Sequence, residues 1–574
     1  MRTTRTLFVV ALAATLAVVP AGGARADRRF TFYGAGWGHG VGLSQWGAYG
    51  LARQGWGAAH ILGHFYRGTR VTTVRSEPSK IRVGLADGLH AVHLTAYGGV
   101  VSVRVGSVSG RLLGRIGSGT TWTVFLRDGR FRVYDSGGRL VGGRSWGGRR
   151  SPLSVRHASP GAAVHVSEAG HSYRRGRIAV EIHACGCAMR ALAVVGPERY
   201  LFGLAEVPSD WPMAAMEAQA VAARTYALNR IRTFGQRRPG CDCGVFASTA
   251  DQVYAGWDKE AGPDGARWRA AVRGTRRQVV TYRGRLIQAY YHSSSGGHTE
   301  SNANVWGGRQ LPYLRGVCDP GDDTPANPNR AWRTTLSGRA IGRRTRSATG
   351  RDIGPAVGFR DIVHFPSGRI DAATVVGMSG SVRVSGNTLA SALGLRDSKV
   401  WINQNRNVRG ALRAAYDALG CAPHLPESPP TRVPGGVRQR FVLGALYRNG
   451  RTGRVVWLHG MMFKHYLAWR GAGGVLGIPT SGIRRVQGAR GCAHVGCERA
   501  LFARGGIYRK PDGPGVHAIF GRVFRAFWGH GGAPRLGFPV SGLRRRRNGW
   551  TSQTFERAVI RCPGHGRCAV RRRR

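Results

Sequence analysis

The residue whose position best suits chemistry is Glu206, a carboxylic acid at a predicted turn directly before a long apolar helix. Burial beside such a helix disfavours the charged form, so the carboxyl group can keep its proton near neutral pH, as a general acid must. The positive end of the helix dipole acts in the opposite direction. Glu206 is the candidate catalytic residue, with Glu217 and Glu300 as alternative acids. A surface carboxylate at a helix start is the competing interpretation.

The helix after Glu206 is predicted to begin near Pro212 and to end at Gly235. Ser209 or Asp210 can cap its first turn. Its apolar stripe recurs at three- and four-residue steps and consists of Met213, Met216, Ala220, Ala223, Ala227 and Ile231. Such small side chains let other elements approach closely, so we expect this helix at the centre of a domain.

Two further segments have the composition of a ligand site. The Gly-dense opening, residues 30–71, contains His39 and Gln45, which could grip a sugar; a packed helical hairpin is the alternative. The segment HSSSGGHTESNANVWGG (292–308) has too few aliphatic residues for a core and is predicted as a sugar-binding rim or a solvated loop. This segment contains no Gly-x-Ser-x-Gly elbow, which disfavours a serine hydrolase.

The length of 574 residues predicts two or three domains. Residues 1–26 have the parts of a secretory signal peptide: early arginines, an apolar run too short to span a bilayer, and an Ala-Arg-Ala end. No later run reaches about 18 apolar residues. We therefore expect a secreted protein with no transmembrane segment after signal cleavage; a retained signal anchor is the alternative.

The chain carries a net charge of +57, and 81 of its 86 basic residues are Arg, which favours compositional drift in a GC-rich genome as one source of the charge. The arginines are spread along the chain rather than gathered in one motif, so a nucleic-acid binder is disfavoured. For an exported protein, acidic wall polymers or an anionic membrane surface are the expected partners.

Ten cysteines in an exported chain favour disulfides. The simplest pairs join near neighbours or leftover residues: Cys492–Cys497, Cys562–Cys568 and Cys318–Cys421. A four-thiolate zinc site is the alternative for the two Cys-x-Cys motifs, which contribute Cys185, Cys187, Cys241 and Cys243. Their spacing is shorter than the common Cys-x2-Cys, and the compartment is oxidising, so disulfides are the preferred prediction and no metal is expected.

Alternating segments between Gly and Asp-Gly turns predict an inserted all-β module, at about 80–150 and continuing toward residue 195. The Pro-rich stretch 421–437 is predicted as a linker. In the tail, residues 438–574, a Phe-x2-Gly-x-(Leu/Ile)-Tyr pattern occurs twice, each copy leading to Leu-Gly-(Ile/Phe)-Pro, and Phe555 begins a degraded third copy. The predicted fold class is α+β: a mixed domain around the central helix, a β module and a small repeat domain.

These segments resemble the SpoIID/LytB-type family of bacterial peptidoglycan lytic transglycosylases and related cell-wall factors. The resemblance is carried by GWGHGVGLSQWGAYG (36–50), EVPSDWPMAAMEAQAVAARTYAL (206–228), DQVYAG (251–256), SSSGGHTE (293–300) and VWGGRQLPYL (305–314). It implies a catalytic domain over residues 27–420. In better-known members the GHGVGLSQWGA block lies near the C-terminal end, so its position here implies a permuted arrangement in which residues 30–71 dock back on the domain. The tail resembles LGFP repeats, which implies attachment to the cell wall.

The resemblance implies that Glu206 protonates the glycosidic oxygen between N-acetylmuramic acid and N-acetylglucosamine, after which the muramic C6 hydroxyl closes on C1 to give a 1,6-anhydro end. The nucleophile belongs to the sugar, so the second carboxylate of ordinary glycosidases is not required. The residues expected to line the cleft are Arg224, Gln219, Tyr226, Ser294, His39 and Gln45.

Some members of the family stimulate separate wall amidases, so a non-enzymatic amidase activator, or a purely wall-binding protein, is the alternative function. Other members bind zinc through Cys and His, a site that the Cys-x-Cys motifs do not clearly reproduce. In either case the resemblance implies peptidoglycan glycan strands as the partner and a location at the cell wall.

Overall fold

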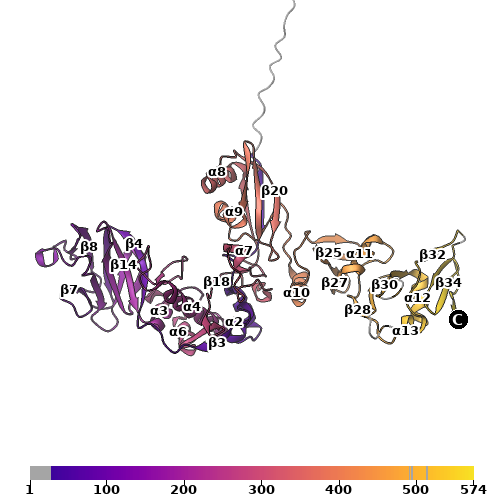
Figure 1. Ribbon diagram of the computed structural model, residues 1–574, viewed down its shortest axis with the longest axis horizontal. Helices are drawn as coiled ribbons and strands as arrows, with labels where there is room; N and C mark the ends of the chain where they lie inside the picture. Colours follow the sequence, from indigo (N-terminus) through magenta and orange to yellow (C-terminus); the bar gives the residue numbers. More distant parts are fainter. Residues whose placement is uncertain are drawn as a thin grey trace, which may run out of the picture.

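The computed structural model describes residues 27–573 except 490, 491, 493–495, 512, 514 and 548. Helices account for 24% and strands for 35%, in several separate sheets, which confirms the α+β class. The predicted signal peptide lies outside the described residues. Within the described part of the chain, no helix has the length and apolar character needed to cross a membrane. Figure 1 shows a β-rich module, a helical layer, an upper α/β unit and the tail.

The β module consists of two sheets, with strand orders β15-β4-β14-β13-β10-β6-β7 and β12-β11-β5-β8-β9. The strands are β4 (Ile81–Leu89), β5 (Ala91–Tyr97), β6 (Val101–Val105), β7 (Leu112–Ile116), β8 (Thr121–Arg127), β9 (Arg130–Tyr134), β10 (Leu153–His157), β11 (Ala163–Val166), β12 (His171–Tyr173), β13 (Arg177–Ile182), β14 (Met189–Val195) and β15 (Val245–Phe246). Their alternating apolar residues form one buried cluster with the helical layer. Because β10 to β14 share these sheets, the module extends past residue 150.

The helix predicted after Glu206 is α4 (Met213–Phe234), and it contacts α1 (Gln45–Arg53), α2 (Ala58–Phe65) and α6 (Gly265–Gly274). Its central position is as expected. Instead of one apolar stripe, however, the helix buries almost every side chain over residues 215–228. Its alanines are small enough to let neighbours approach from several sides, so the apolar pattern extends round the helix.

The start of α4 differs from the sequence prediction. Pro212 is the N-cap residue and no side chain caps the helix, so the predicted capping by Ser209 or Asp210 is wrong. Pro212 has no N–H of its own to satisfy, and its C=O accepts from Ala215 N at 3.0 Å and from Met216 N at 3.2 Å. Gly235, at φ 76°, ends the helix as predicted.

The N-terminal segment completes parts of the structure that come much later in the chain. β1 (Arg29–Gly34) lies antiparallel between β19 (Trp332–Ser337) and β23 (Val400–Ile402). β2 (Leu43–Ser44) runs parallel to β18 (Tyr291–His292). The segment therefore docks back on the domain, which is the arrangement that the early position of the Gly-dense block requires.

The upper unit in Figure 1 is built on the antiparallel sheet β20-β21-β22, with two helices packed against it. Its elements are α8 (Gly338–Thr349), β20 (Ala356–His364), β21 (Ile370–Gly377), β22 (Gly380–Ser385) and α9 (Gly386–Leu393). Phe30 and Phe32 of β1 belong to its core. The other elements near the site are β3 (Arg70–Thr73), α3 (Pro197–Phe202), α5 (Trp257–Ala261), β16 (Gln278–Tyr282), β17 (Arg285–Leu286), α7 (Asn302–Trp306) and α10 (Gly410–Ala418).

The tail contains three four-stranded sheets in chain order, at the right of Figure 1. They comprise β24 (Thr431–Val433), β25 (Gly436–Phe441), β26 (Gly444–Asn449), β27 (Val455–His459), β28 (Arg484–Arg485), β29 (Glu498–Phe502), β30 (Gly505–Lys510), β31 (Gly515–Phe520), β32 (Arg544–Arg545), β33 (Thr551–Thr554), β34 (Ala558–Cys562) and β35 (Ala569–Arg572). Helices α11 (Gly460–Ala468) and α12 (Gly521–Gly529) follow the first two. The degraded third copy thus keeps a complete sheet.

The stretch 421–437 is not a bare linker in this structure. Pro426 forms a β-bridge with Phe441, and β24 pairs with β25. Cys421, bonded to Cys318, packs in one apolar cluster with Tyr416 and Phe441. Pro429 and Pro430 directly precede β24 and Pro434 follows it, so these prolines cost the pairing with β25 no ladder bond, and a Pro-rich composition is compatible with an ordered connection.

Candidate active site

Glu206 lies in the turn between α3 and α4, beside the loop that follows β15. Val253 N donates to Glu206 Oε1 at 2.7 Å. The hydroxyl of Tyr291 donates to the same oxygen at 2.9 Å. The side chain of Gln45, at the start of α1, also hydrogen-bonds the carboxyl group. The groups that contact the acid thus come from three distant segments, and all of them are uncharged.

Burial raises the pKa of Glu206 because it disfavours the carboxylate, and the hydrogen bonds from Val253, Tyr291 and Gln45 oppose this shift without cancelling it. Burial therefore has a larger effect on the pKa of Glu206 than its hydrogen bonds have. The residue nevertheless remains partly exposed. Since Oε1 already accepts two hydrogen bonds, the proton of the acid form belongs on Oε2. The site can hold a proton, release it, and stabilise the carboxylate that remains.

Tyr291 is oriented by the side chain of Gln252. Gln252 Nε2 donates to the Tyr291 hydroxyl at 2.9 Å and to Ala223 O, on α4, at 3.2 Å, while its Oε1 accepts from Tyr200 at 2.9 Å. The amide donor occupies the acceptor side of the Tyr291 hydroxyl, so the hydroxyl proton points to Glu206. Burial and the neighbouring Glu206 raise the pKa of Tyr291 well above its ordinary value, so Tyr291 remains a neutral donor.

The sequence does not single out Tyr291, Gln252 or Val253 as site residues. The available signal is their place inside DQVYAG (251–256) and directly before HSSSGG, two segments that already carry the family resemblance. Nothing in residue type alone distinguishes Tyr291 from the other tyrosines of the chain, because its role depends on the strand pairing of β18.

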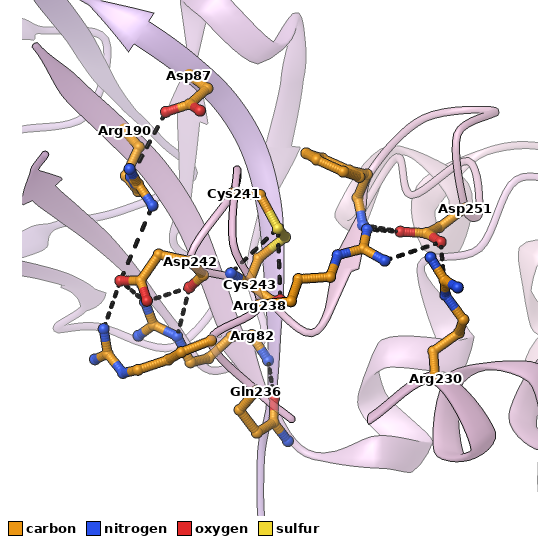
Figure 2. Close-up of a disulfide and its surroundings, with 12 residues drawn as sticks. Arg82, Asp87, Arg190, Arg230, Gln236, Arg238, Cys241, Asp242, Cys243 and Asp251 are labelled. Carbon is orange, nitrogen blue, oxygen red and sulfur yellow. Dashed lines mark hydrogen bonds and ion pairs between the residues drawn. A yellow bond between two sulfur atoms is a disulfide. The ribbon is translucent and has the colours of Figure 1, made fainter. Parts of the chain in front are cut away.

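The loop that carries these donors is anchored by Asp251, whose buried carboxylate lies against the guanidinium groups of Arg230 and Arg238 (Figure 2). The same carboxylate accepts from the Tyr226 hydroxyl at 2.7 Å. The Cys241–Cys243 disulfide closes the turn after Arg238, whose N–H donates to Cys243 O at 3.3 Å. These contacts fix the loop to α4.

Tyr226 and His39, both predicted binding residues, lie beside Tyr291. The rings of Tyr226 and Tyr291 are 6.3 Å apart. His39 Nδ1 accepts from Val41 N at 3.0 Å, and a further backbone hydrogen bond joins the ring to Tyr291. Burial lowers the pKa of His39 to about 4, so the ring is neutral. With both nitrogens used by the backbone, His39 offers a ring face rather than a hydrogen bond to a sugar.

Three other predicted cleft residues are enclosed, which corrects the prediction that they line a cleft. Arg224 is 1% exposed, and its guanidinium binds both oxygens of Glu198 at 3.1 Å. Ser294 is 0% exposed and donates to Asp322 at 2.8 Å. Gln219 is 1% exposed, and its amide has no hydrogen-bond partner among the described residues. The packing round α4 and the Ser-rich segment covers these side chains.

The two alternative acids fit proton transfer less well than Glu206. Glu300 is buried, with Oε1 accepting from Ser301 N at 2.8 Å and from Asn304 Nδ2 at 2.9 Å, and Oε2 paired with Ser367. Burial raises the pKa of Glu217, which lies beside Gly274 at the end of α6. Glu300 is thus enclosed by its partners, whereas Glu217 is half-buried and lacks the neutral donors that hold Glu206.

The cysteines are joined as five disulfides: Cys185–Cys187, Cys241–Cys243, Cys318–Cys421, Cys492–Cys497 and Cys562–Cys568. The disulfides that were expected are present. In this state the two Cys-x-Cys motifs offer no thiolate to a metal, because each sulfur is already bonded. A zinc site remains a prediction for the reduced chain.

The fold and site define a class: an α+β protein in which one partly exposed carboxylic acid, held by neutral donors, stands before a buried helix. Residues 187–282, which include Glu206 and α4, match the family described as SpoIID, Stage II sporulation protein. The match contains Gln252 and Val253, whereas Tyr291 and the N-terminal segment lie outside it.

Three individual relatives each match this chain over a segment of 132 to 134 residues. An uncharacterized protein of Brachyspira hyodysenteriae is 38% identical over 134 residues, 23% of this chain and 33% of the relative. The amidase enhancer of Bacillus subtilis is 36% identical over 132 residues, 23% and 16% of the two chains. Stage II sporulation protein D of Bacillus amyloliquefaciens is 34% identical over 134 residues, 22% and 39%. The alignments thus span 39% or less of each of these relatives.

Proposed function

We propose that the protein is a secreted, wall-associated lytic transglycosylase that cleaves the bond between N-acetylmuramic acid and N-acetylglucosamine in peptidoglycan, with Glu206 as general acid and then base. The observation that carries the proposal is the state of Glu206: its pKa is raised by burial, one oxygen is fixed by Val253 and Tyr291, and the side chain remains partly exposed. The similarity of residues 187–282 to SpoIID supports a cell-wall substrate.

The mechanism needs one carboxyl group that changes protonation state twice. Glu206 Oε2 gives its proton to the glycosidic oxygen as the bond to C1 breaks. The C6 hydroxyl of the same muramic acid attacks C1, and its proton passes to the Glu206 carboxylate, so the acid form is restored. The uncharged donors Tyr291, Val253 and Gln45 stabilise the transient carboxylate without lowering its pKa as far as a cation would.

Product analysis tests this proposal. Wild-type protein should cleave defined glycan strands into fragments with 1,6-anhydromuramic ends, which mass spectrometry identifies. The Glu206→Gln variant should still bind the strands but should release no fragments. Glu217→Gln is the matched control and should keep the activity. Reducing ends without an anhydro sugar would identify a hydrolase instead, and equal activity in Glu206→Gln would remove Glu206 from the mechanism.

A second candidate function is stimulation of a wall amidase by a protein without enzymatic activity of its own. It is favoured by one observation, the similarity of a 132-residue segment to a protein named amidase enhancer. Incubation with a purified wall amidase distinguishes the two functions. Stimulation that survives Glu206→Gln supports the activator, whereas anhydro products without amidase support the enzyme.

The tail provides the expected attachment to acidic wall polymers. Residues 438–574 carry 28 Lys and Arg against three acidic residues, and many of the arginines are exposed. Attraction to polyanions in water is screened by salt. Binding of the full chain to isolated walls should therefore weaken as salt rises, and chemical removal of wall phosphate and carboxylate polymers should leave only the binding of the glycan strands by the Glu206 site. Tight binding to DNA that persists without the tail would contradict this assignment.

A further inference from the structure

A half-exposed aromatic ring near the site belongs to Trp306, at the end of the short helix α7. Its side chain is 49% exposed, an unusual state for tryptophan in a folded protein. The ring lies against two others, with centroids 5.0 Å from His39 and 4.7 Å from Tyr290. Trp306 therefore presents one surface to solvent while its other contacts hold it in place.

The ring cluster is continuous with the candidate acid. The centroid of Tyr290 lies 5.9 Å from that of Tyr226, which in turn lies 6.3 Å from that of Tyr291. The Tyr291 hydroxyl is bound to Glu206. Each step joins neighbouring rings, so Trp306 belongs to the same ring cluster as the tyrosine that supports Glu206.

Helix α7 is fixed at both ends, although it is only five residues long. At its start, Asn302 Oδ1 accepts from Gln310 Nε2 at 2.8 Å, and Glu300 accepts from Asn304 at 2.9 Å. Near its end, Asn387 Nδ2 of α9 donates to Val305 O at 2.9 Å. The exposed ring is thus positioned before any ligand binds, which reduces the entropy lost on binding.

We propose that Trp306, supported by His39 and Tyr290, is a stacking platform for a pyranose ring of the glycan strand, at a subsite remote from the bond held at Glu206. The apolar face of a sugar ring can stack on an indole ring whose edge remains exposed to solvent. A protein partner fits less well, because one half-exposed ring is far smaller than the roughly 800 Å² that each side of a stable protein interface buries. The inference rests on the proposed glycan substrate.

Calorimetry with soluble strands of alternating N-acetylglucosamine and N-acetylmuramic acid, eight sugars long, tests the platform. All proteins carry Glu206→Gln, so the strands stay intact. Adding Trp306→Ala should weaken binding about tenfold, and Trp306→Phe should retain most of the affinity because it keeps an aromatic face. Trp528→Ala, which removes a 40% exposed tryptophan from the tail, is the matched control and should bind like the parent.

Unchanged affinity in Trp306→Ala would overturn the platform, as would an equal loss in Trp306→Ala and Trp528→Ala. Loss of binding to a wall amidase with no loss of glycan binding would also overturn it and assign the ring to a protein partner. The experiment does not measure cleavage, so a negative result is distinct from failure of the proposed function. If cleavage depends on Glu206 but Trp306→Ala leaves glycan affinity unchanged, only the platform is rejected.

Discussion

Glu206 and the pair Asp319 and Asp322 are desolvated carboxyl groups whose surroundings differ. Glu206 accepts hydrogen bonds only from neutral donors and remains partly exposed. Asp319 and Asp322 are enclosed, at 0% and 1% exposure. They accept from the hydroxyls of the Ser-rich segment, and Arg413 and Lys399 lie near enough to oppose the effect of burial.

The comparison shows that a raised pKa does not by itself mark a catalytic acid. Burial and the charge of Asp322 raise the pKa of Asp319 to about 7, a value well suited to proton transfer. Yet Asp319 has no access to solvent, and its role is to join the N-terminal segment, the Ser-rich segment and the 319–323 turn. What distinguishes Glu206 is access combined with neutral support, so that its proton can leave and return.

The largest expected effect is the loss of activity in Glu206→Gln. Cleavage of glycan strands should fall by about a thousandfold, because general acid–base catalysis by one side chain is worth about that much. The melting temperature should hardly change, since the glutamine oxygen can still accept from Val253 and Tyr291. Initial rates and a thermal melt check both. A large drop in melting temperature would place Glu206 with the structural acids instead.

Replacing Asp322 should have the opposite pattern. Asp322→Ala removes the acceptor for Ser294 Oγ, Ser295 N and Ser44 Oγ and leaves these donors buried without a partner. We expect a loss of about 3 kcal/mol in unfolding free energy. Denaturant unfolding followed by tryptophan fluorescence measures it. Asp322→Asn, which keeps one acceptor oxygen, is the milder control and should lose less.

Tyr291→Phe sharpens the account of how Glu206 is supported. The Tyr291 hydrogen bond lowers the pKa of Glu206, so its removal raises that pKa further. An acid with a higher pKa stays protonated to higher pH, and the alkaline limb of the pH–rate profile should shift upward while the rate falls about tenfold. Tyr226→Phe, whose hydroxyl binds Asp251 instead, should leave the limb in place. A limb that moves equally in both variants would contradict the role of Tyr291.

The smallest effect concerns the pH dependence of stability. The folded state raises the pKa of Asp319 from 3.8 to about 7, so between these values the folded chain binds more protons than the unfolded chain. Stability from this residue is present below about pH 4 and is lost as pH rises toward 7. Asp319→Asn should flatten the fall in melting temperature over that range. An unchanged slope would show that other groups dominate.

Particular elements show which structural features can be predicted from local sequence patterns. The α4 helix and its end at Gly235 were predicted correctly, because helix periodicity and a glycine stop are local properties. The cap was not, since Pro212 replaced a side-chain cap. Arg224 and Ser294 were assigned to a cleft from their residue types, whereas the structure buries both. Whether a polar side chain faces solvent depends on its packing neighbours, which residue type does not specify.

The sequence by itself determined that a carboxylic acid stands before the main helix, that the tail is repetitive, and that arginine supplies most of the positive charge. Only the tertiary structure decided that Gln45, Val253 and Tyr291 meet at Glu206. The strand pairing of β2 with β18 brings these distant segments together, and desolvation, which sets the pKa of the acid, arises only when they pack.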